Sequence, residues 1–459
     1  MNQIEQQDKE YLWHPFTQMK GWLEEPQTVI ASAKGIMLTD TEGRSYYDAV
    51  SSLWVNIHGH GRAEIDEAIQ AQLGKVAHST ALGLANIPAA QFAAELIAAA
   101  PKGLCKVFYS DDGSTAIEVA IKMAFQYWQH QGRPNKKRFI SLEQAYHGDT
   151  VGTVSVGGID LFHRVFQPLL FKPFSIPSPS CYHCKLAKSP ETCQWECVKA
   201  LEDLLADHHG EIAALVMEPL VQAAAGMLMA RPGYLAKVRE LTQRYEVLLI
   251  ADEVATGFGR TGTLFACEQE GVTPDFMALS KGITGGYMPL AATVTTQAVF
   301  DAFLGDMAAK KTFYHGHSYT ANQLACAAAL ASLRIFKKDQ VIENLPPKLA
   351  AIAEELTKIA ALEHVGDARQ CGMIAGIELM ADSATKTPYA WDQTMGAKVC
   401  MKAREHGIFI RPVGDVIVFM PPLVSTVTEI RHMLSQVAAA IDEVTNQGQF
   451  STCGGGAHF

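Results

Sequence analysis

Short apolar runs alternate with amphipathic segments through the middle of this sequence, and that alternation limits the possible folds more than any other feature. Four runs have the length and apolar content of buried strands: Lys106–Ser110, Lys137–Leu142, Ile212–Leu220 and Val247–Asp252. Two segments between them, 115–130 and 234–245, place apolar residues at helical spacing. Strands alternating with helices predict an α/β fold, in which helices cover a mainly parallel sheet.

A second pattern begins near residue 336. The stretches 366–379 and 407–422 contain short strand-like runs separated by Gly and Pro turns. We therefore predict three parts: an N-terminal segment over 1–60 that packs on the small domain, a large domain over 61–335, and a small C-terminal α+β domain over 336–459. We expect the glycine-rich tail at the end of the small domain to be frayed.

The composition disfavours several classes of protein. The net charge is −10 and hydrophobic residues make up 48% of the chain, which argues against disorder and against a nucleic-acid-binding surface. No apolar run approaches the roughly 20 residues that a membrane-spanning helix requires. The N-terminal residues are polar, and the 10 cysteines of this long chain are expected to be mostly reduced. We expect a cytoplasmic protein with no nucleic-acid or membrane partner.

Three features in a fixed order indicate a cofactor site. The Gly113-Ser114 turn opens a predicted helix, where backbone N–H groups and a hydroxyl can bind a phosphate. Asp252 ends a buried strand, at the sheet edge where ligands collect in α/β folds. Lys281 lies among small residues that leave space for a ring. Together they favour pyridoxal phosphate, whose aldehyde forms a Schiff base with lysine and whose ring nitrogen pairs with a carboxylate.

Tyr146 and His147 follow the predicted strand 137–142 and belong to the same expected site. Tyr146 could lie on the face of the cofactor ring, with His147 supporting it. Each feature alone has a structural explanation, because Gly-Ser turns cap helices and Asp is common in turns. A rival motif, Gly257–Gly262, matches the dinucleotide-binding G-x-G-x-x-G, but it neither follows a strand directly nor opens a long helix. The occurrence of the Gly-Ser turn, the aspartate and the lysine together, in this order, therefore favours pyridoxal phosphate.

Four cysteines form a separate motif in a Pro- and Ser-rich insertion. Cys181, Cys184, Cys193 and Cys197 have the spacing C-x2-C-x8-C-x3-C. Four thiolates at such spacing can form a tetrahedral zinc site. The alternative is a loop of reduced, partly buried or oxidised cysteines, and this alternative is favoured, so no metal is expected at the active site.

These residues resemble the class III aminotransferases. The resemblance is carried by DEVATGFGRTG (Asp252–Gly262) and LSKGITGGYMPL (Leu279–Leu290). It implies the fold type I architecture of pyridoxal-phosphate enzymes, with a mainly parallel seven-stranded sheet and a smaller α+β domain. WHPFTQM (Trp13–Met19), SSLWVNIHGH (Ser51–His60) and AYHGDT (Ala145–Thr150) are similar to one branch. That branch makes diaminopelargonate in biotin synthesis, converting 8-amino-7-oxononanoate (KAPA) to 7,8-diaminononanoate (DAPA).

The resemblance also implies roles for individual residues. It makes Lys281 the Schiff-base lysine, Asp252 the partner of the ring nitrogen and Tyr146 the residue stacked on the ring. The remaining implied cofactor residues are Gly113 and Ser114 at the phosphate, His147 beside Tyr146, and His317 and Ser318 from a neighbouring subunit. Gly316, next to His317, is an implied substrate residue. These enzymes are dimers with shared active sites, so the resemblance implies a homodimer.

The substrate residues that the resemblance implies also suit KAPA chemically. Arg411 would hold the substrate carboxylate, since a guanidinium binds a carboxylate with two hydrogen bonds. Phe16 and Trp54 would cover the aliphatic chain. Asp149 could select the ammonium group of the acceptor. The structural alternatives are a helix cap for Asp149 and an ordinary salt bridge for Arg411.

The amino donor depends on smaller differences. Well-known members of the branch use S-adenosylmethionine and have Tyr at the position of Phe16, Trp at Leu53 and Pro at His317. The WHPFTQM opening and the HGHSYT loop look more like the lysine-using variant, so we expect L-lysine as the donor and S-adenosylmethionine as the alternative. Two wider alternatives are a broad ω-amine:pyruvate or 4-aminobutyrate-type transaminase, and a non-catalytic protein that keeps the fold.

Overall fold

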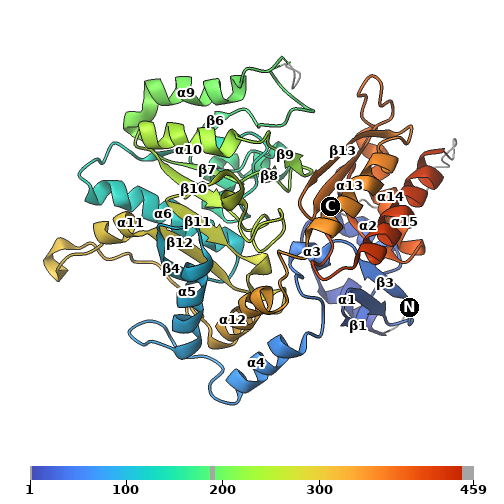
Figure 1. The fold of residues 1–459 in the computed structure, drawn as a ribbon, viewed down its shortest axis with the longest axis horizontal. Helices are drawn as coiled ribbons and strands as arrows, with labels where there is room; N and C mark the ends of the chain where they lie inside the picture. The colour runs from blue at the N-terminus through green and yellow to red at the C-terminus, as the bar shows by residue number, and fades with distance from the viewer. Residues whose placement is uncertain (1–2, 187–191, 447–459) are drawn as a thin grey trace. The chain divides into compact units, whose positions relative to one another are not determined.

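The structure, a computed structural model, describes residues 3–186 and 192–446. The chain forms two compact units (Figure 1). The larger unit is Ala63–Ile342, and the other combines Met1–Arg62 with Glu343–Phe459. The glycine-rich tail, Cys453–Phe459, for which the sequence predicts fraying, lies outside the described residues.

A seven-stranded sheet forms the centre of the larger unit, with the strand order β4-β12-β11-β10-β7-β5-β6. Its strands are β4 (Leu104–Ser110), β5 (Arg138–Leu142), β6 (Phe174–Ile176), β7 (Ile212–Met217), β10 (Leu248–Asp252), β11 (Phe276–Leu279) and β12 (Ala291–Thr296). Strand β12 is antiparallel to both of its neighbours, whereas the other pairs are parallel. The predicted α/β fold with a mainly parallel seven-stranded sheet is therefore confirmed.

Helices cover both faces of this sheet because successive strand residues point to opposite sides. Leu215 and Met217 of β7 pack into a core with α9 (Glu196–His208) and α10 (Tyr234–Arg244). The alternate residues of β7 pack into a second core with α6 (Gly113–His130). Figure 1 shows α9 and α10 on one side of the sheet and α6 on the other.

Shorter elements complete the larger unit. Helix α12 packs against α4 and α5. These other elements are α4 (Ala63–Leu73), α5 (Ile87–Ala99), α7 (Val151–Ser155), α8 (Asp160–His163), α11 (Gln297–Ala302), α12 (Gln323–Lys338), β8 (Val221–Gln222) and β9 (Leu228–Met229). The predicted strand Ile212–Leu220 was wrong at its C-terminal end, since β7 stops at Met217. Pro219 cannot donate a ladder hydrogen bond, and Leu220 has a φ of 64°.

The other unit contains two four-stranded sheets. One has the order β1-β2-β3-β15 and the other β13-β14-β17-β16. The strands are β1 (Ile30–Lys34), β2 (Met37–Asp40), β3 (Ser45–Asp48), β13 (Val365–Cys371), β14 (Ile374–Leu379), β15 (Ile408–Phe409), β16 (Arg411–Val413) and β17 (Val416–Phe419). The helices are α1 (Gln3–Tyr11), α2 (Met19–Glu24), α3 (Ser51–Trp54), α13 (Pro346–Ile359), α14 (Met395–Glu405) and α15 (Val427–Asn446). Helix α15 packs against α13 and α14.

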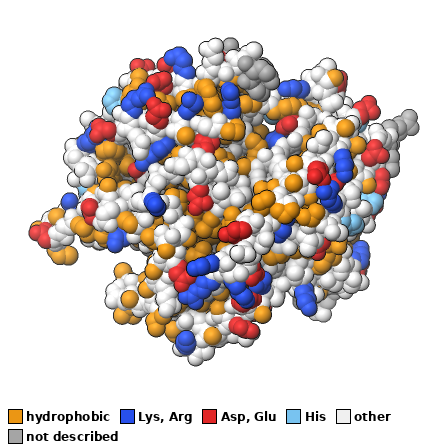
Figure 2. Space-filling view, viewed as in Figure 1, with side chains coloured by type: hydrophobic (Ala, Val, Ile, Leu, Met, Phe, Trp, Pro, Cys, Tyr) orange, Lys and Arg blue, Asp and Glu red, His pale blue; other side chains and the backbone are white. Residues whose placement is uncertain are grey.

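The surface carries both signs of charge. On the face drawn in Figure 2, acidic and basic side chains are interspersed, with hydrophobic side chains between them. Among the residues that the structure describes, no helix is both long and apolar enough to cross a membrane.

Candidate active site

The functional side chains of the larger unit follow the C-terminal ends of parallel strands. Asp252 is the last residue of β10, and Lys281 comes two residues after β11. His147 follows β5, and Glu218 directly follows β7. Because parallel strands end at the same edge of a sheet, their loops meet there. The topology therefore gathers these groups at one edge.

Asp252 and His147 form a buried hydrogen-bonded pair. The distance from His147 Nδ1 to Asp252 Oδ2 is 2.7 Å, and the Val254 amide donates to Asp252 Oδ1 at 3.0 Å. An ionised carboxylate only accepts, so Nδ1 carries the proton in this pair. The other ring nitrogen, Nε2, is buried and has no hydrogen-bond partner within the described part of the chain. The pair thus holds the Asp252 carboxylate in one orientation.

Lys281 lies among charged groups of both signs. Burial lowers its pKa and the charge of Arg260 lowers it further, whereas Asp252 and Glu218 oppose the shift. Arg260 is itself 1% exposed. A lower pKa leaves more of the lysine as a free amine, which is the form that acts as a nucleophile or a base. Lys281 therefore has the environment expected of a catalytic lysine.

Glu218 is a site residue that the sequence reasoning missed. Its carboxylate accepts a hydrogen bond from the Ala223 amide at 2.8 Å and a longer one from the Tyr146 amide at 3.4 Å. Burial raises the pKa of Glu218 to about 7, while the nearby charge of His147 lowers it and that of Asp252 raises it. The only sequence signal was its place directly after a buried strand, where Asp252 also stands.

We expect the Glu218→Gln variant to be more stable than the wild type at pH 8, by a margin that shrinks as the pH falls toward 5. The raised pKa of Glu218 means that the folded state holds a proton that the unfolded state releases between about pH 4.5 and 7. Wild-type stability therefore falls as the pH rises through this window, and glutamine removes that loss. Thermal melting of both proteins without cofactor measures it. An equal difference at both pH values would contradict the raised pKa.

The start of α6 is arranged to bind an anion. Asp112 caps the helix, because its Oδ1 accepts from the Thr115 amide at 2.9 Å and its amide donates to Thr115 Oγ1 at 3.1 Å. Helix geometry leaves the amides of Gly113 and Ser114 without intrahelical acceptors. A Cβ on Gly113 would lie 2.6 Å from Val254 Cγ1, so only glycine fits there. These amides can bind a phosphate.

The Ser114 hydroxyl, in contrast, is held inside the protein. Its Oγ accepts from the Thr150 amide at 3.0 Å and lies 2.9 Å from the hydroxyls of both Thr150 and Thr153. A Cβ on Gly148 would lie 2.3 Å from this oxygen, so the two segments pack closely. In this structure the Ser114 hydroxyl connects α6 to the segment after His147, and its amide is the group left for an anion.

Tyr146 and Asp149 contact each other. The Tyr146 hydroxyl donates to Asp149 Oδ2 at 2.8 Å. Burial and this hydrogen bond raise the pKa of Tyr146, so the phenol stays neutral. Asp149 is exposed and remains open to a cation in solution.

The comparisons with known proteins agree with this arrangement. The profile of the family described as "Aminotransferase class-III" matches residues 20–441. The chain belongs to this family. A protein of Geobacter sulfurreducens named adenosylmethionine-8-amino-7-oxononanoate aminotransferase is 55% identical over 439 residues, covering 95% of this chain and 97% of the relative. A relative of the same name from Methanocaldococcus jannaschii is 46% identical over 453 residues, covering 96% and 98%.

Solved structures of class III aminotransferases share the whole fold. The crystal structure of the Methanocaldococcus jannaschii enzyme gives a TM-score of 0.92 at 45% identity and covers 96% of this chain and 98% of its own. An ω-transaminase from Pseudomonas jessenii, in complex with PMP, gives 0.92 at 30% identity and covers 97% and 99%. The predictions of a class III fold and of an aminotransferase are confirmed, and a non-catalytic binding protein is set aside.

Class III aminotransferases depend on pyridoxal phosphate, so the predicted cofactor is confirmed as well. The residues present fit this group. Lys281 supplies an amine for the aldehyde, Asp252 a fixed carboxylate for the ring nitrogen, and the amides of Gly113 and Ser114 supply donors for the phosphate. Each polar part of the cofactor thus has a matching group in the larger unit.

The loop that the family resemblance assigns to a neighbouring subunit is exposed in this chain. His317 Nδ1 lies 3.4 Å from Asp111 Oδ2, and the carbonyl oxygen of Ser318 accepts from His78 Nε2 at 2.7 Å. Gly316 has a φ of 152°, which favours glycine. His317 therefore contacts Asp111, which lies two residues before Gly113 in the same chain, and its role toward a partner stays a prediction.

Three predicted substrate residues belong to the smaller unit. Phe16 is exposed and has a φ of 48°. Trp54 is buried, at the end of α3. Arg411 begins β16 opposite Val418, and burial lowers its pKa. Their contact with a substrate stays a prediction, since each is placed only within its own unit.

The four cysteines lie together. All four line one small pocket, and each is a free thiol. Burial raises the pKa of Cys197 to about 11, and the thiol of Cys193 adds to the shift. Over residues 3–186 and 192–446, no group of three or more His, Cys, Asp or Glu is arranged to hold a metal ion. The structure thus shows a thiol cluster, and a zinc site there stays the less favoured alternative of the sequence analysis.

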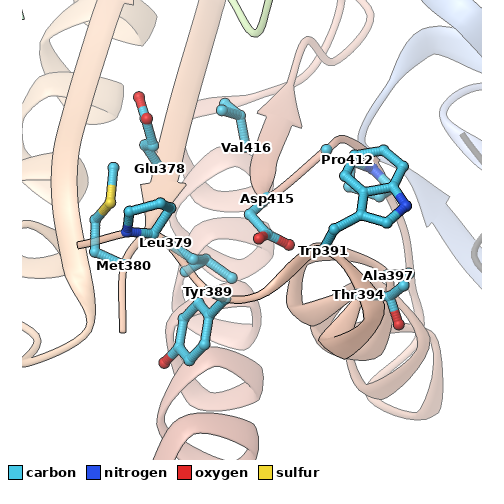
Figure 3. Close-up of a pocket in the computed structure, with 12 residues that line it drawn as sticks. Glu378, Leu379, Met380, Tyr389, Trp391, Thr394, Ala397, Pro412, Asp415 and Val416 are labelled. Carbon is cyan, nitrogen blue, oxygen red and sulfur yellow. The ribbon is translucent and has the colours of Figure 1, made fainter. Parts of the chain in front are cut away.

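A separate pocket of about 270 Å³ lies in the smaller unit (Figure 3). Tyr389, Trp391 and Pro412 form part of its wall, and the Asp415 carboxylate lies between the two aromatic side chains. Asp415 Oδ1 accepts from the Gly396 amide at 2.8 Å, which caps α14. This carboxylate is therefore used in the fold, and none of the predicted site residues lines the pocket.

Proposed function

We propose that this class III aminotransferase transfers an amino group to KAPA and so forms DAPA in biotin synthesis, with L-lysine as the donor. The observation that carries the chemistry is the buried Asp252–His147 pair at the sheet edge that also bears Lys281. The acceptor is supported by the names of relatives at 46–55% identity, which specify 8-amino-7-oxononanoate.

The residues of the larger unit have separate roles in the reaction. When bound, pyridoxal phosphate supplies an electron-withdrawing ring that stabilises negative charge at the reacting carbon. Asp252 keeps the ring nitrogen protonated, and His147 orients Asp252 through Nδ1. Lys281, whose pKa burial lowers, removes a proton from the donor carbon and returns one during the second half of the reaction. The amides of Gly113 and Ser114 hold the phosphate.

Substrate recognition rests on residues that complement the two ends of KAPA. Arg411 would bind the carboxylate and Trp54 and Phe16 the methylene chain. Asp149 would attract the ammonium, and the hydrogen bond from Tyr146 holds its carboxylate in place. The carboxylate of KAPA would thus pair with a cation, Arg411, and its ammonium with an anion, Asp149.

Two donors each have an observation in their favour. Phe16 lacks the phenol of the S-adenosylmethionine-using members, and His317 replaces their proline, which favours L-lysine. The relatives' names specify adenosylmethionine, which makes that compound the second candidate donor.

A donor–acceptor panel tests the proposal. We expect purified enzyme with bound cofactor to form DAPA from KAPA and L-lysine, with the parallel double-reciprocal lines of a ping-pong reaction. S-adenosylmethionine, pyruvate and 2-oxoglutarate are offered in parallel, with DAPA and the oxo products measured by mass spectrometry. DAPA formed only with S-adenosylmethionine would overturn the lysine donor. Transfer to pyruvate without transfer to KAPA would favour the broad transaminase, whose fold the Pseudomonas jessenii enzyme shares.

We further propose that the enzyme is a homodimer with shared active sites. A run of exposed apolar side chains in the larger unit supports a second copy as the partner. These residues are Leu73, Val76, Leu82, Leu84 and Ile87. The exposed loop at Gly316–Ser318 supports the sharing of sites. Sedimentation velocity is expected to show a dimer, and a monomer at micromolar concentration would refute this.

A further inference from the structure

Four consecutive residues in the smaller unit adopt a left-handed backbone, and none of them is glycine. The φ angles are 52° at Ser51, 58° at Ser52, 124° at Leu53 and 67° at Trp54. Residues with side chains rarely adopt this region, and then as single residues, because the Cβ meets the following carbonyl oxygen. The sequence has no local preference for such a turn, so surrounding groups must hold it.

Asp48 is the group that holds the turn. Its side chain is fully buried. The Ser52 amide donates to Asp48 Oδ1 at 2.7 Å, and the Ser52 hydroxyl donates to Oδ2 at 2.8 Å. His60 Nε2 lies 3.3 Å from the same Oδ2. One carboxylate therefore makes two hydrogen bonds to the residue at the centre of the turn.

The backbone around Asp48 is fixed from both sides. Asp48 ends β3 and pairs with Phe409 of β15. The next amide, that of Ala49, donates to the Phe409 carbonyl at 2.9 Å, and the Met420 amide donates to the Ala49 carbonyl at 2.9 Å. The Ser51 hydroxyl donates to the Met420 carbonyl at 2.7 Å. The turn is thus attached to a rigid part of the fold rather than to a free loop.

We propose that Asp48 is a positioning residue for the acceptor, because it holds the left-handed turn that orients Leu53 and Trp54. Leu53 is 47% exposed while Trp54 is 8% exposed, so the turn directs neighbouring side chains to different environments. This inference rests on the proposed function, in which Trp54 covers the chain of KAPA. Loss of Asp48 releases the turn and disorders that contact without touching the groups that carry out proton transfer.

The strain itself is tested by two variants that both lack the Ser52 hydroxyl. Glycine adopts a φ of 58° without strain, whereas alanine, like serine, adopts it at a cost, so Ser52→Gly is expected to melt about 2 °C or more above Ser52→Ala. In an ordinary right-handed or extended segment, Ser52→Gly would melt at the same temperature as Ser52→Ala or below it. That result would contradict a positive φ at Ser52. This comparison needs no substrate, so it stands even if KAPA is not the acceptor.

The positioning role is tested by Asp48→Ala against a matched control, Asp40→Ala. Asp40 is 3% exposed in the same sheet and holds a different turn through the amides of Glu42 and Arg44. We expect Asp48→Ala to raise the KM for KAPA roughly 10-fold or more with kcat changed less than about 3-fold. Asp40→Ala is expected to lower the melting temperature and leave KM within about 2-fold.

Equal KM effects in the two alanine variants, or a KM for Asp48→Ala within about 3-fold of wild type, would overturn the inference. Should Asp48→Ala not fold, Asp48→Asn takes its place, because an amide oxygen still accepts from the Ser52 amide. Its KM is expected to rise about 3-fold or more, and an unchanged KM would contradict the role. If the wild-type enzyme were inactive toward KAPA, the proposed function would be wrong. The melting temperatures of the Ser52 variants would still test whether the left-handed turn is present.

Discussion

Lys281→Ala protein with pyridoxal phosphate added will lack the visible absorption band of a lysine-bound cofactor, and its turnover will fall by about 10⁴ or more. The variant loses both the covalent attachment and the group that moves the proton. Burial lowers the pKa of Lys281, which favours the uncharged amine that can act as a base. Absorption spectra and single-turnover rates, measured at saturating cofactor, test both losses.

Lys136 provides a matched control for Lys281. It is 1% exposed in the same unit, and burial lowers its pKa to about 8. Its ammonium, however, donates to the carbonyls of His209 at 2.7 Å and Glu246 at 2.8 Å, so its role is structural. Lys136→Met is expected to be less stable yet to keep the band in its folded fraction. A Lys281→Ala enzyme that kept both the band and normal turnover would refute the assignment.

The sheet of the larger unit could be predicted because strand and helix periods differ. Alternating apolar runs located β5, β7 and β10, and the end of β10 then placed Asp252 at the sheet edge where ligands collect. The predicted end of β7 was wrong, since the predicted strand ran to Leu220 whereas β7 stops at Met217, before Glu218 and Pro219. Apolar content shows where a strand can lie, whereas hydrogen bonding decides where it ends.

Glu218 and Asp48 could not be found from the sequence because their importance lies in long-range contacts. Glu218 differs from an ordinary turn residue only through its burial beside His147 and Asp252. In the sequence, Asp48 resembles any acidic residue at the end of a strand. Only the structure shows that it binds Ser52, which has a positive φ. A function that depends on residue type, such as that of the lysine in its Gly-rich turn, can be recognised from the local sequence. A function that depends on the surroundings of a residue can be recognised only from the folded structure.

The same limit explains the Ser114 hydroxyl. The sequence placed a hydroxyl at a helix start, where it could face a phosphate or the protein. The structure turns it toward Thr150 and Thr153, which lie 36 and 39 residues further along the chain. Helix capping rules give the position of the group, but its direction depends on residues that local patterns do not connect.

Asp252→Asn is expected to keep the fold and lower kcat by about 10²–10³. The amide has the size of the carboxylate, and its oxygen still accepts from the Val254 amide. Its nitrogen would face His147 Nδ1, so the ring must move its proton to Nε2, a buried atom without a partner among the described residues. That shift is possible, but the negative charge that keeps a ring nitrogen protonated is lost. Melting temperature and single-turnover rate separate the two effects.

Asp275→Asn is the matched control for this loss of charge. Asp275 lies just before β11 and is bound by Arg239 at 2.7 Å and by the Leu249 amide at 2.8 Å, so its carboxylate is used to join β10 and α10. Its replacement is expected to lower the melting temperature with kcat within about 3-fold of wild type. If Asp252→Asn instead lost stability and kept at least half of the wild-type kcat, the carboxylate would be a structural partner of His147. Because the Asp252 carboxylate makes two hydrogen bonds within residues 3–186 and 192–446 and stands beside a lysine with a lowered pKa, we expect the opposite pattern.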